Sequence, residues 1–98
     1  VEIEVVDLRS LIPWDKETVL NSVARTNRVL VLHEANLTAG VGAEIAATIS
    51  EHAFQHLDAP VMRLASLDTP VPFSAYLEQH VYFPKDRLPD KIRELLRY

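Results

Sequence analysis

The chain has 98 residues, of which 48% are hydrophobic and 24% charged, and its formal net charge at pH 7 is −4. This length supports one domain with a single modest core, and the composition is that of a folded globular protein rather than a disordered or fibrous one. Its 10 Lys and Arg residues are scattered along an acidic chain, so no continuous basic surface is predicted for a nucleic acid.

The absence of cysteine excludes disulfides, thiolate metal sites and cysteine nucleophiles. No apolar run approaches the roughly 20 residues that a membrane-spanning helix needs. The start of the chain, Val1-Glu2-Ile3-Glu4, lacks the basic beginning and apolar middle of a signal peptide. We therefore expect a cytoplasmic domain without a membrane partner. Since the first residue is not Met, we also expect the chain to be a fragment of a larger one.

The first third of the chain predicts a strand and then a helix. Ile3 to Leu8 is rich in β-branched residues and begins with apolar/acidic alternation, which favours a strand. Asp15 is a good N-cap for the following helix, and Asn27 suits a left-handed residue at its end. The buried stripe of this helix is expected to contain Val19, Leu20 and Val23.

The segment from Arg28 to His33 contains an unbroken aliphatic run from Val29 to Leu32. Because such a run favours a strand covered on both faces, we expect it to be the central strand of a parallel sheet. After a loop from Glu34 to Gly42, the pattern predicts a helix of about four turns. Its inward residues are expected to be Ile45, Ala46, Ile49 and Ala53. Its outward residues are expected to be Glu44, Thr48, Glu51, His52 and Gln55.

The last third predicts a short strand, an irregular loop and a helix. Val61 to Ala65 is the third expected strand, and the prolines between Leu67 and Pro72 exclude regular structure there. Pro89 favours the first turn of a final helix. The inward residues of that helix are expected to be Ile92, Leu95 and Leu96.

Alternation of strands and helices predicts an α/β fold with three layers, α/β/α, and a mostly parallel sheet. One domain is expected over residues 1–98. Three strands make a thin sheet, so we expect this domain to lack a first strand and helix that a fuller version would place before Val1.

His33 and Glu34 are the best chemical candidates, since they follow a buried strand at the edge where open α/β sheets place their ligand crevices. A histidine there could act as a general base or donor near neutral pH. The alternative is that both residues hold loop backbone or contact a neighbouring subunit. Neighbouring side chains on a strand point to opposite faces, so the two need not meet.

Gly40-Val41-Gly42 precedes a helix, as in turns that bind phosphate through free N–H groups and the helix dipole. The dinucleotide fingerprint is incomplete, because Ile45 stands where a third glycine would be, and there is no lysine for a Walker-type loop. The alternative is a tight turn that has no ligand.

His52 and His56 lie four residues apart on one helix, a spacing that can bring two imidazoles to a metal. Ala53 stands where a zinc peptidase would have glutamate. We therefore expect two solvated histidines rather than a metal site.

Asp68 opens a loop that carries both charge and aromatic side chains. The spacing allows an ion pair between Arg63, which interrupts an apolar strand, and Asp68 at the strand's exit. Two prolines stiffen the segment that ends at Phe73, and stiff aromatic loops bind partners with little loss of entropy. Packing of Phe73, Tyr76 and Tyr82 onto the domain's own core is the alternative.

Four segments form a recognisable pattern: Val6–Asp15, Val31–Ala35, Gly40–Ala46 and Ala59–Pro70. Together they resemble the β subunits of 2-oxo acid dehydrogenase E1 components over nearly the whole chain. Trp14, the Leu-Asp-Thr-Pro loop and the terminal Leu96-Arg97-Tyr98 are more similar to the branched-chain (2-oxoisovalerate) members than to the pyruvate members.

This resemblance implies a transketolase C-terminal-type domain. It implies oxidative decarboxylation of a 2-oxo acid on thiamine diphosphate and magnesium, with the acyl group passed to a lipoyl arm of E2. The family binds that cofactor in other domains, and this chain lacks the Gly-Asp-Gly stretch with a following Asn that would hold it. The resemblance therefore implies no catalytic, cofactor-binding or metal residue here.

The partners implied are the E1 α part, a second E1 β part and the peripheral-subunit-binding domain of E2. Docking to E2 is expected at Tyr98, and the interface or strand-end crevice is expected to contain His33, Glu34, Asp68 and Phe73. The alternatives are the same domain of a pyruvate dehydrogenase, of a deoxyxylulose-phosphate synthase or of a transketolase. A free-standing module that binds a small anion near His33 and Gly42 is an alternative of another class.

Overall fold

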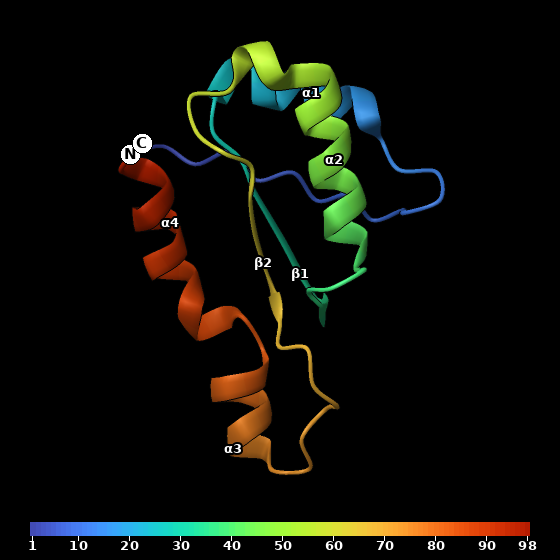
Figure 1. Ribbon diagram of the computed structural model, residues 1–98, viewed down its shortest axis with the longest axis vertical. Helices are drawn as coiled ribbons and strands as arrows, with labels where there is room; N and C mark the ends of the chain where they lie inside the picture. The colour runs from blue at the N-terminus through green and yellow to red at the C-terminus, as the bar shows by residue number, and fades with distance from the viewer.

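Two parallel strands form the centre of the structure, a computed structural model that describes all 98 residues (Figure 1). The strands are β1 (Leu30–Asn36) and β2 (Met62–Ser66). The helices are α1 (Lys16–Thr26), α2 (Val41–Ala53), α3 (Ala75–Leu77) and α4 (Leu88–Leu96). The remaining elements are short helical turns. Phe54–His56 and Lys85–Arg87 are 3₁₀ turns, and Glu78–Tyr82 is a π turn.

The two faces of the sheet meet different helices, because neighbouring side chains on a strand point to opposite sides. Val31 packs against the core formed by α1 and α2. Leu30 and its partner across the sheet, Met62, pack with Leu95 of α4. The strands are therefore the middle of three layers, and the α/β/α arrangement expected from the sequence is confirmed.

The main core lies between α1 and α2, where Val23 is 2% and Ile49 0% exposed. The predicted ends of α1 are confirmed. The Asp15 carboxylate accepts a hydrogen bond from the Thr18 N–H at 3.1 Å, and Asn27 ends the helix in the left-handed conformation with φ 67°. These bonds satisfy terminal backbone groups that the helix itself leaves unpaired.

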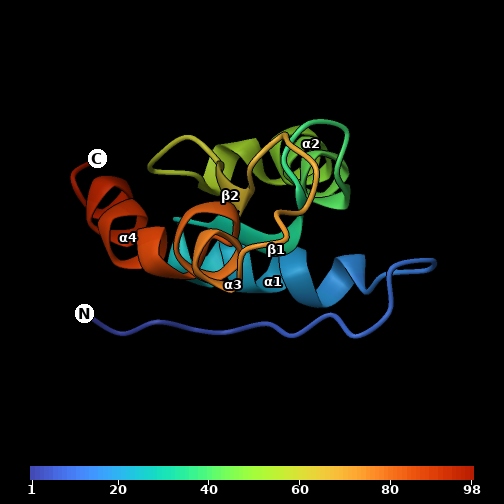
Figure 2. The same cartoon turned by 90° about the horizontal axis from the view of Figure 1, so that it is seen from below.

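No strand forms over Ile3 to Leu8, where the sequence predicted one. This stretch runs extended along one side of the molecule (Figure 2), and Val6 and Leu8 pack onto the main core. A strand also needs a neighbour that completes its ladder of backbone hydrogen bonds, and the sheet contains only β1 and β2. The residue pattern predicted the extended backbone correctly, but this segment has no neighbouring strand with which to pair.

The expectation that β1 is buried on both faces was wrong. Leu32 is 47% exposed, although it belongs to the aliphatic run. The reason is that β1 has one neighbouring strand instead of two, and the contact with α4 is made by Leu30 at the beginning of the strand.

Two helix positions also differ from the prediction. Thr48 of α2 was expected to face water but is 7% exposed, and its hydroxyl donates to the Glu44 carbonyl oxygen at 2.9 Å. That bond satisfies the hydroxyl inside the helix, so its burial leaves no polar group unpaired. Leu96 of α4 was expected inside but is 43% exposed, because Leu95 takes the position that faces the sheet.

Replacing Ile49 by Ala should lower the free energy of unfolding by about 2–5 kcal/mol, since it leaves a cavity in the centre of the core. Ser50→Ala on the exposed face of the same helix should change it by less than about 0.5 kcal/mol. Urea denaturation of both variants measures the difference, and equal effects would contradict the packing of α2 described above.

Candidate functional site at the strand ends

The loops that follow β1 and β2 lie side by side, because parallel pairing brings the carboxyl ends of both strands to one edge of the sheet. The first contact is between backbones: the Leu37 N–H donates to the Ser66 carbonyl oxygen at 3.1 Å. This edge is where the sequence placed its candidate site.

Asp68 connects the two loops through hydrogen bonds. Its carboxylate accepts hydrogen bonds from the Thr38 N–H at 2.9 Å and from the Thr38 hydroxyl. The hydroxyl bond first, and the backbone bond second, hold the pKa of the Asp68 carboxyl below its usual range. The predicted ion pair with Arg63 does not form; the Arg63 guanidinium donates instead to the Leu37 carbonyl oxygen at 3.1 Å.

Tyr82 adds a second connection that the sequence did not predict. Its ring is buried, and its hydroxyl donates to the Asn36 Oδ1 atom at 2.6 Å, at the end of β1. Arg87 also reaches this edge, donating to the Ala65 carbonyl oxygen at 2.9 Å. Both residues come from the irregular segment before α4, so no periodic pattern could have placed them.

His33 lies against the turn into α2. A Cβ atom added to Gly42 would lie 2.6 Å from the imidazole Cδ2 and Nε2 atoms, and one added to Gly40 would lie 2.7 Å from Cε1. Both ring nitrogens are shielded from solvent and have no hydrogen-bond partner in the protein. The two glycines therefore make room for the imidazole, while Glu34 points to solvent.

The aromatic loop divides into exposed and buried members. Tyr82 packs inside, whereas Phe73 is fully exposed and Tyr76 is 68% exposed. These two rings belong to the segment that projects from the body of the domain around α3, at the bottom of Figure 1. Packing onto the domain's own core, one of the two alternatives for this loop, therefore applies only to Tyr82.

Tyr98 lies at the other end of the domain, away from this edge (Figure 1). Its side chain is exposed, and its carbonyl oxygen accepts a hydrogen bond from Arg28. The Arg28 guanidinium also lies 4.0 Å from the Asp58 carboxylate. The residues proposed from the sequence thus form two separate groups, one at the strand ends and one at Tyr98.

His52 and His56 are both exposed, and His52 lies 4.0 Å from the Glu51 carboxylate. No group of three or more His, Cys, Asp or Glu side chains comes together in a way that could hold a metal ion. None of the helices has the length and apolar character required to cross a membrane.

Comparison with known protein families identifies the family of this chain. Residues 1–88 match the family model described as Transketolase, C-terminal domain. The chain therefore belongs to the transketolase C-terminal domain family, as its fold and its motifs indicated.

Individual relatives are β subunits of 2-oxo acid dehydrogenases. The chain is 48% identical over its whole length to 2-oxoisovalerate dehydrogenase subunit beta 2, mitochondrial, of Arabidopsis thaliana. It is 44% identical over 95% of its length to the pyruvate dehydrogenase E1 component subunit beta of Porphyra purpurea, and 44% identical over 86% to the 2-oxoisovalerate dehydrogenase subunit beta of Pseudomonas aeruginosa. It spans 27%, 28% and 23% of these relatives. The resemblance inferred from the motifs is confirmed.

Gly42→Ala should destabilise the domain by about 1–3 kcal/mol, because the added methyl group collides with the His33 ring. Helix propensity alone predicts the opposite sign. The double variant His33→Ala, Gly42→Ala should lose less stability than the two single variants lose together, because the ring that collides with the added methyl group is gone. Thermal unfolding measures all three, and strict additivity would contradict the contact.

Asp68→Asn should lower the stability of the domain at neutral pH. It should also make stability decrease less as the solution is acidified. Because the pKa of Asp68 is lowered by folding, its contribution is complete above the unfolded value of about 3.9 and is lost as the pH falls through the folded value. Denaturation of parent and variant from pH 7 to 2 measures this effect. The difference between their free energies of unfolding should shrink below about pH 4. Thr38→Val should reproduce this behaviour and add little to Asp68→Asn.

Proposed function

We propose that the chain is the C-terminal assembly domain of the β part of a thiamine-diphosphate-dependent 2-oxo acid dehydrogenase E1. The full enzyme oxidatively decarboxylates a branched-chain 2-oxo acid, 2-oxoisovalerate, and passes the acyl group to the lipoyl arm of E2. The observation that carries this proposal is the match of the whole chain, at 48% identity, to a 2-oxoisovalerate dehydrogenase β subunit. On this proposal the chain is a fragment, and its parent contains further domains.

The cofactor and its magnesium are bound by those other domains. The acidic group at the strand ends, Asp68, is already engaged by Thr38, and the ring nitrogens of His33 are enclosed by the chain itself. Neither group is free to hold a metal-bound diphosphate. This supports an assembly role for residues 1–98 rather than a part in the chemistry.

The partners proposed are the E1 α part, a second β part and E2. Phe73 is exposed in the segment that follows Asp68, together with Val71, Tyr76 and Leu77. A group of exposed apolar side chains is a common mark of an interface, which suits contact with another β part. Tyr98 is accessible for docking the peripheral-subunit-binding domain of E2. A cytoplasmic location remains part of the proposal, although names among the relatives include mitochondrial and chloroplastic forms.

Pyruvate is the second candidate substrate, because pyruvate dehydrogenase β subunits match at 44%, 42% and 49% identity over 95%, 80% and 78% of the chain. A deoxyxylulose-phosphate synthase or transketolase would share the domain but not the pattern from Leu67 to Phe73. The small-anion module is disfavoured by the imidazole of His33, which fills the space beside Gly40 and Gly42.

The proposal is tested by measuring 2-oxo acid dehydrogenase activity of the full-length parent with its α part, thiamine diphosphate and magnesium. We expect a higher kcat/KM with 2-oxoisovalerate than with pyruvate, and no activity of residues 1–98 alone. A preference for pyruvate would change the substrate but keep the class. Activity on sugar phosphates, or none on either 2-oxo acid, would overturn the proposal.

A further inference from the structure

Three segments that lie far apart in the sequence meet beside the start of β1. The first is the turn after α1, which carries Asn27 and Arg28. The Asn27 Nδ2 atom donates to the His56 carbonyl oxygen at 2.7 Å, and the Asp58 N–H donates to the Asn27 carbonyl oxygen at 2.8 Å. Arg28 donates to the carbonyl oxygen of Tyr98, after α4. The turn after α1 therefore connects the loop before β2 with the segment that follows α4.

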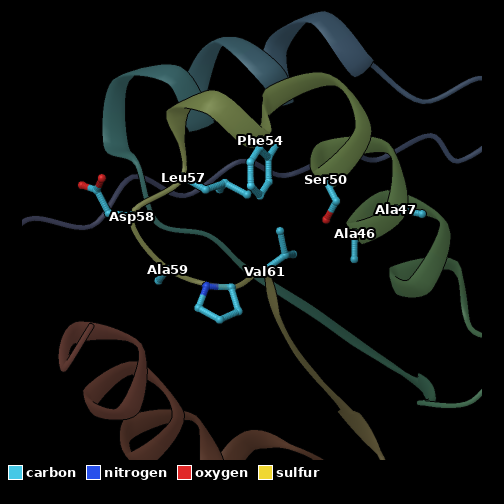
Figure 3. Close-up of a pocket in the computed structure, with 9 residues that line it drawn as sticks. Ala46, Ala47, Ser50, Phe54, Leu57, Asp58, Ala59 and Val61 are labelled. Carbon is cyan, nitrogen blue, oxygen red and sulfur yellow. The ribbon is translucent and has the colours of Figure 1, made fainter.

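Arg28 reaches both of the other segments with one guanidinium group. Its Nη2 atom donates to Tyr98, and its Nη1 atom lies 4.0 Å from the Asp58 carboxylate. The loop that carries Asp58 also borders a cavity of about 630 Å³ beside α2, and the carboxylate points away from the other residues that line it (Figure 3). The planar fork of arginine suits two acceptors at once, whereas lysine offers a single point charge.

Tyr98 is held through its backbone, while its ring is free. Arg28 makes the one hydrogen bond that reaches this residue. The nearest buried side chain before it is Leu95, which packs with Ala59 beside the sheet. Chain segments beyond the last packed residue are poorly ordered unless such contacts tie them down. Because the Tyr98 residue is 58% exposed, the bond from Arg28 fixes the backbone and leaves the aromatic ring accessible.

We propose that Arg28 is a positioning residue for the docking of E2, because it holds the Tyr98 backbone so that the exposed ring is presented in one orientation. This rests on the docking role proposed above for Tyr98. An ordered backbone has less conformational entropy to lose when the ring binds, and the ordering of one residue corresponds to roughly tenfold in affinity. The contribution of Arg28 to docking is therefore indirect.

Direct contact with E2 is the alternative role for Arg28. Its guanidinium is already directed at Tyr98 and Asp58, its Nε atom is shielded from solvent, and only 32% of its side chain is exposed. A positioning residue acts through the Tyr98 ring, so its effect on binding should vanish when that ring is removed. A residue that touches E2 itself keeps its effect. A double-mutant cycle therefore separates the two roles.

The experiment measures the dissociation constant between the full-length parent E1, assembled with its α part, and the purified peripheral-subunit-binding domain of its E2. Arg28→Met keeps the apolar stem, removes every donor and should weaken binding roughly tenfold. Arg28→Lys keeps the charge and one donor, so it should weaken binding by only about threefold. Arg93→Met is the matched control, since it removes an exposed arginine of α4 that pairs with Asp90, and it should leave binding unchanged.

Tyr98→Ala completes the cycle. Removing the ring should weaken binding by about tenfold or more, as for an aromatic residue at the centre of a contact. Adding Arg28→Met to Tyr98→Ala should then change binding by less than about twofold, because no ring remains to be positioned. The melting temperature of each variant checks that the protein is folded at the temperature of the binding measurement.

The possible outcomes separate the role of Arg28 from that of Tyr98. Weaker binding of Tyr98→Ala together with unchanged binding of Arg28→Met would overturn the positioning role and leave the docking role intact. Equal losses from Arg28→Met with and without the ring would assign Arg28 a direct contact and also overturn the positioning role. Unchanged binding of Tyr98→Ala would overturn the docking role itself, and the positioning role with it.

Discussion

Parallel pairing of β1 with β2 is the constraint on which the rest of the domain depends. Parallel strands cannot be joined by a tight hairpin, so the chain must cross over, and α2 is that crossover. Pairing also sets which side chains of β1 face α1 and α2 and which face α4. Finally, it brings both carboxyl ends to one edge, where Asp68 can reach Thr38 across the two loops.

The polar groups at that edge are used to hold the chain together. Asp68, Arg63, Tyr82 and Arg87 all bond to atoms of the loops or the strand ends. His33 is enclosed by the glycines beside it. In many α/β proteins such an edge binds a ligand, but here these four side chains direct hydrogen bonds to the chain itself. That arrangement supports the assembly role proposed above.

Sequence by itself determined the features that depend on near neighbours along the chain. The caps at Asp15 and Asn27 and the amphipathic core helices could be predicted, because local hydrogen bonds and residue periodicity specify them. The family was indicated separately, by the resemblance of four sequence segments. Only tertiary structure decided the rest. Whether Ile3 to Leu8 is a strand depends on a partner, and whether Asp68 bonds Thr38 or Arg63 depends on how two loops meet. Tyr82 reaches Asn36 across 46 residues of chain, a distance over which sequence spacing carries no geometric information.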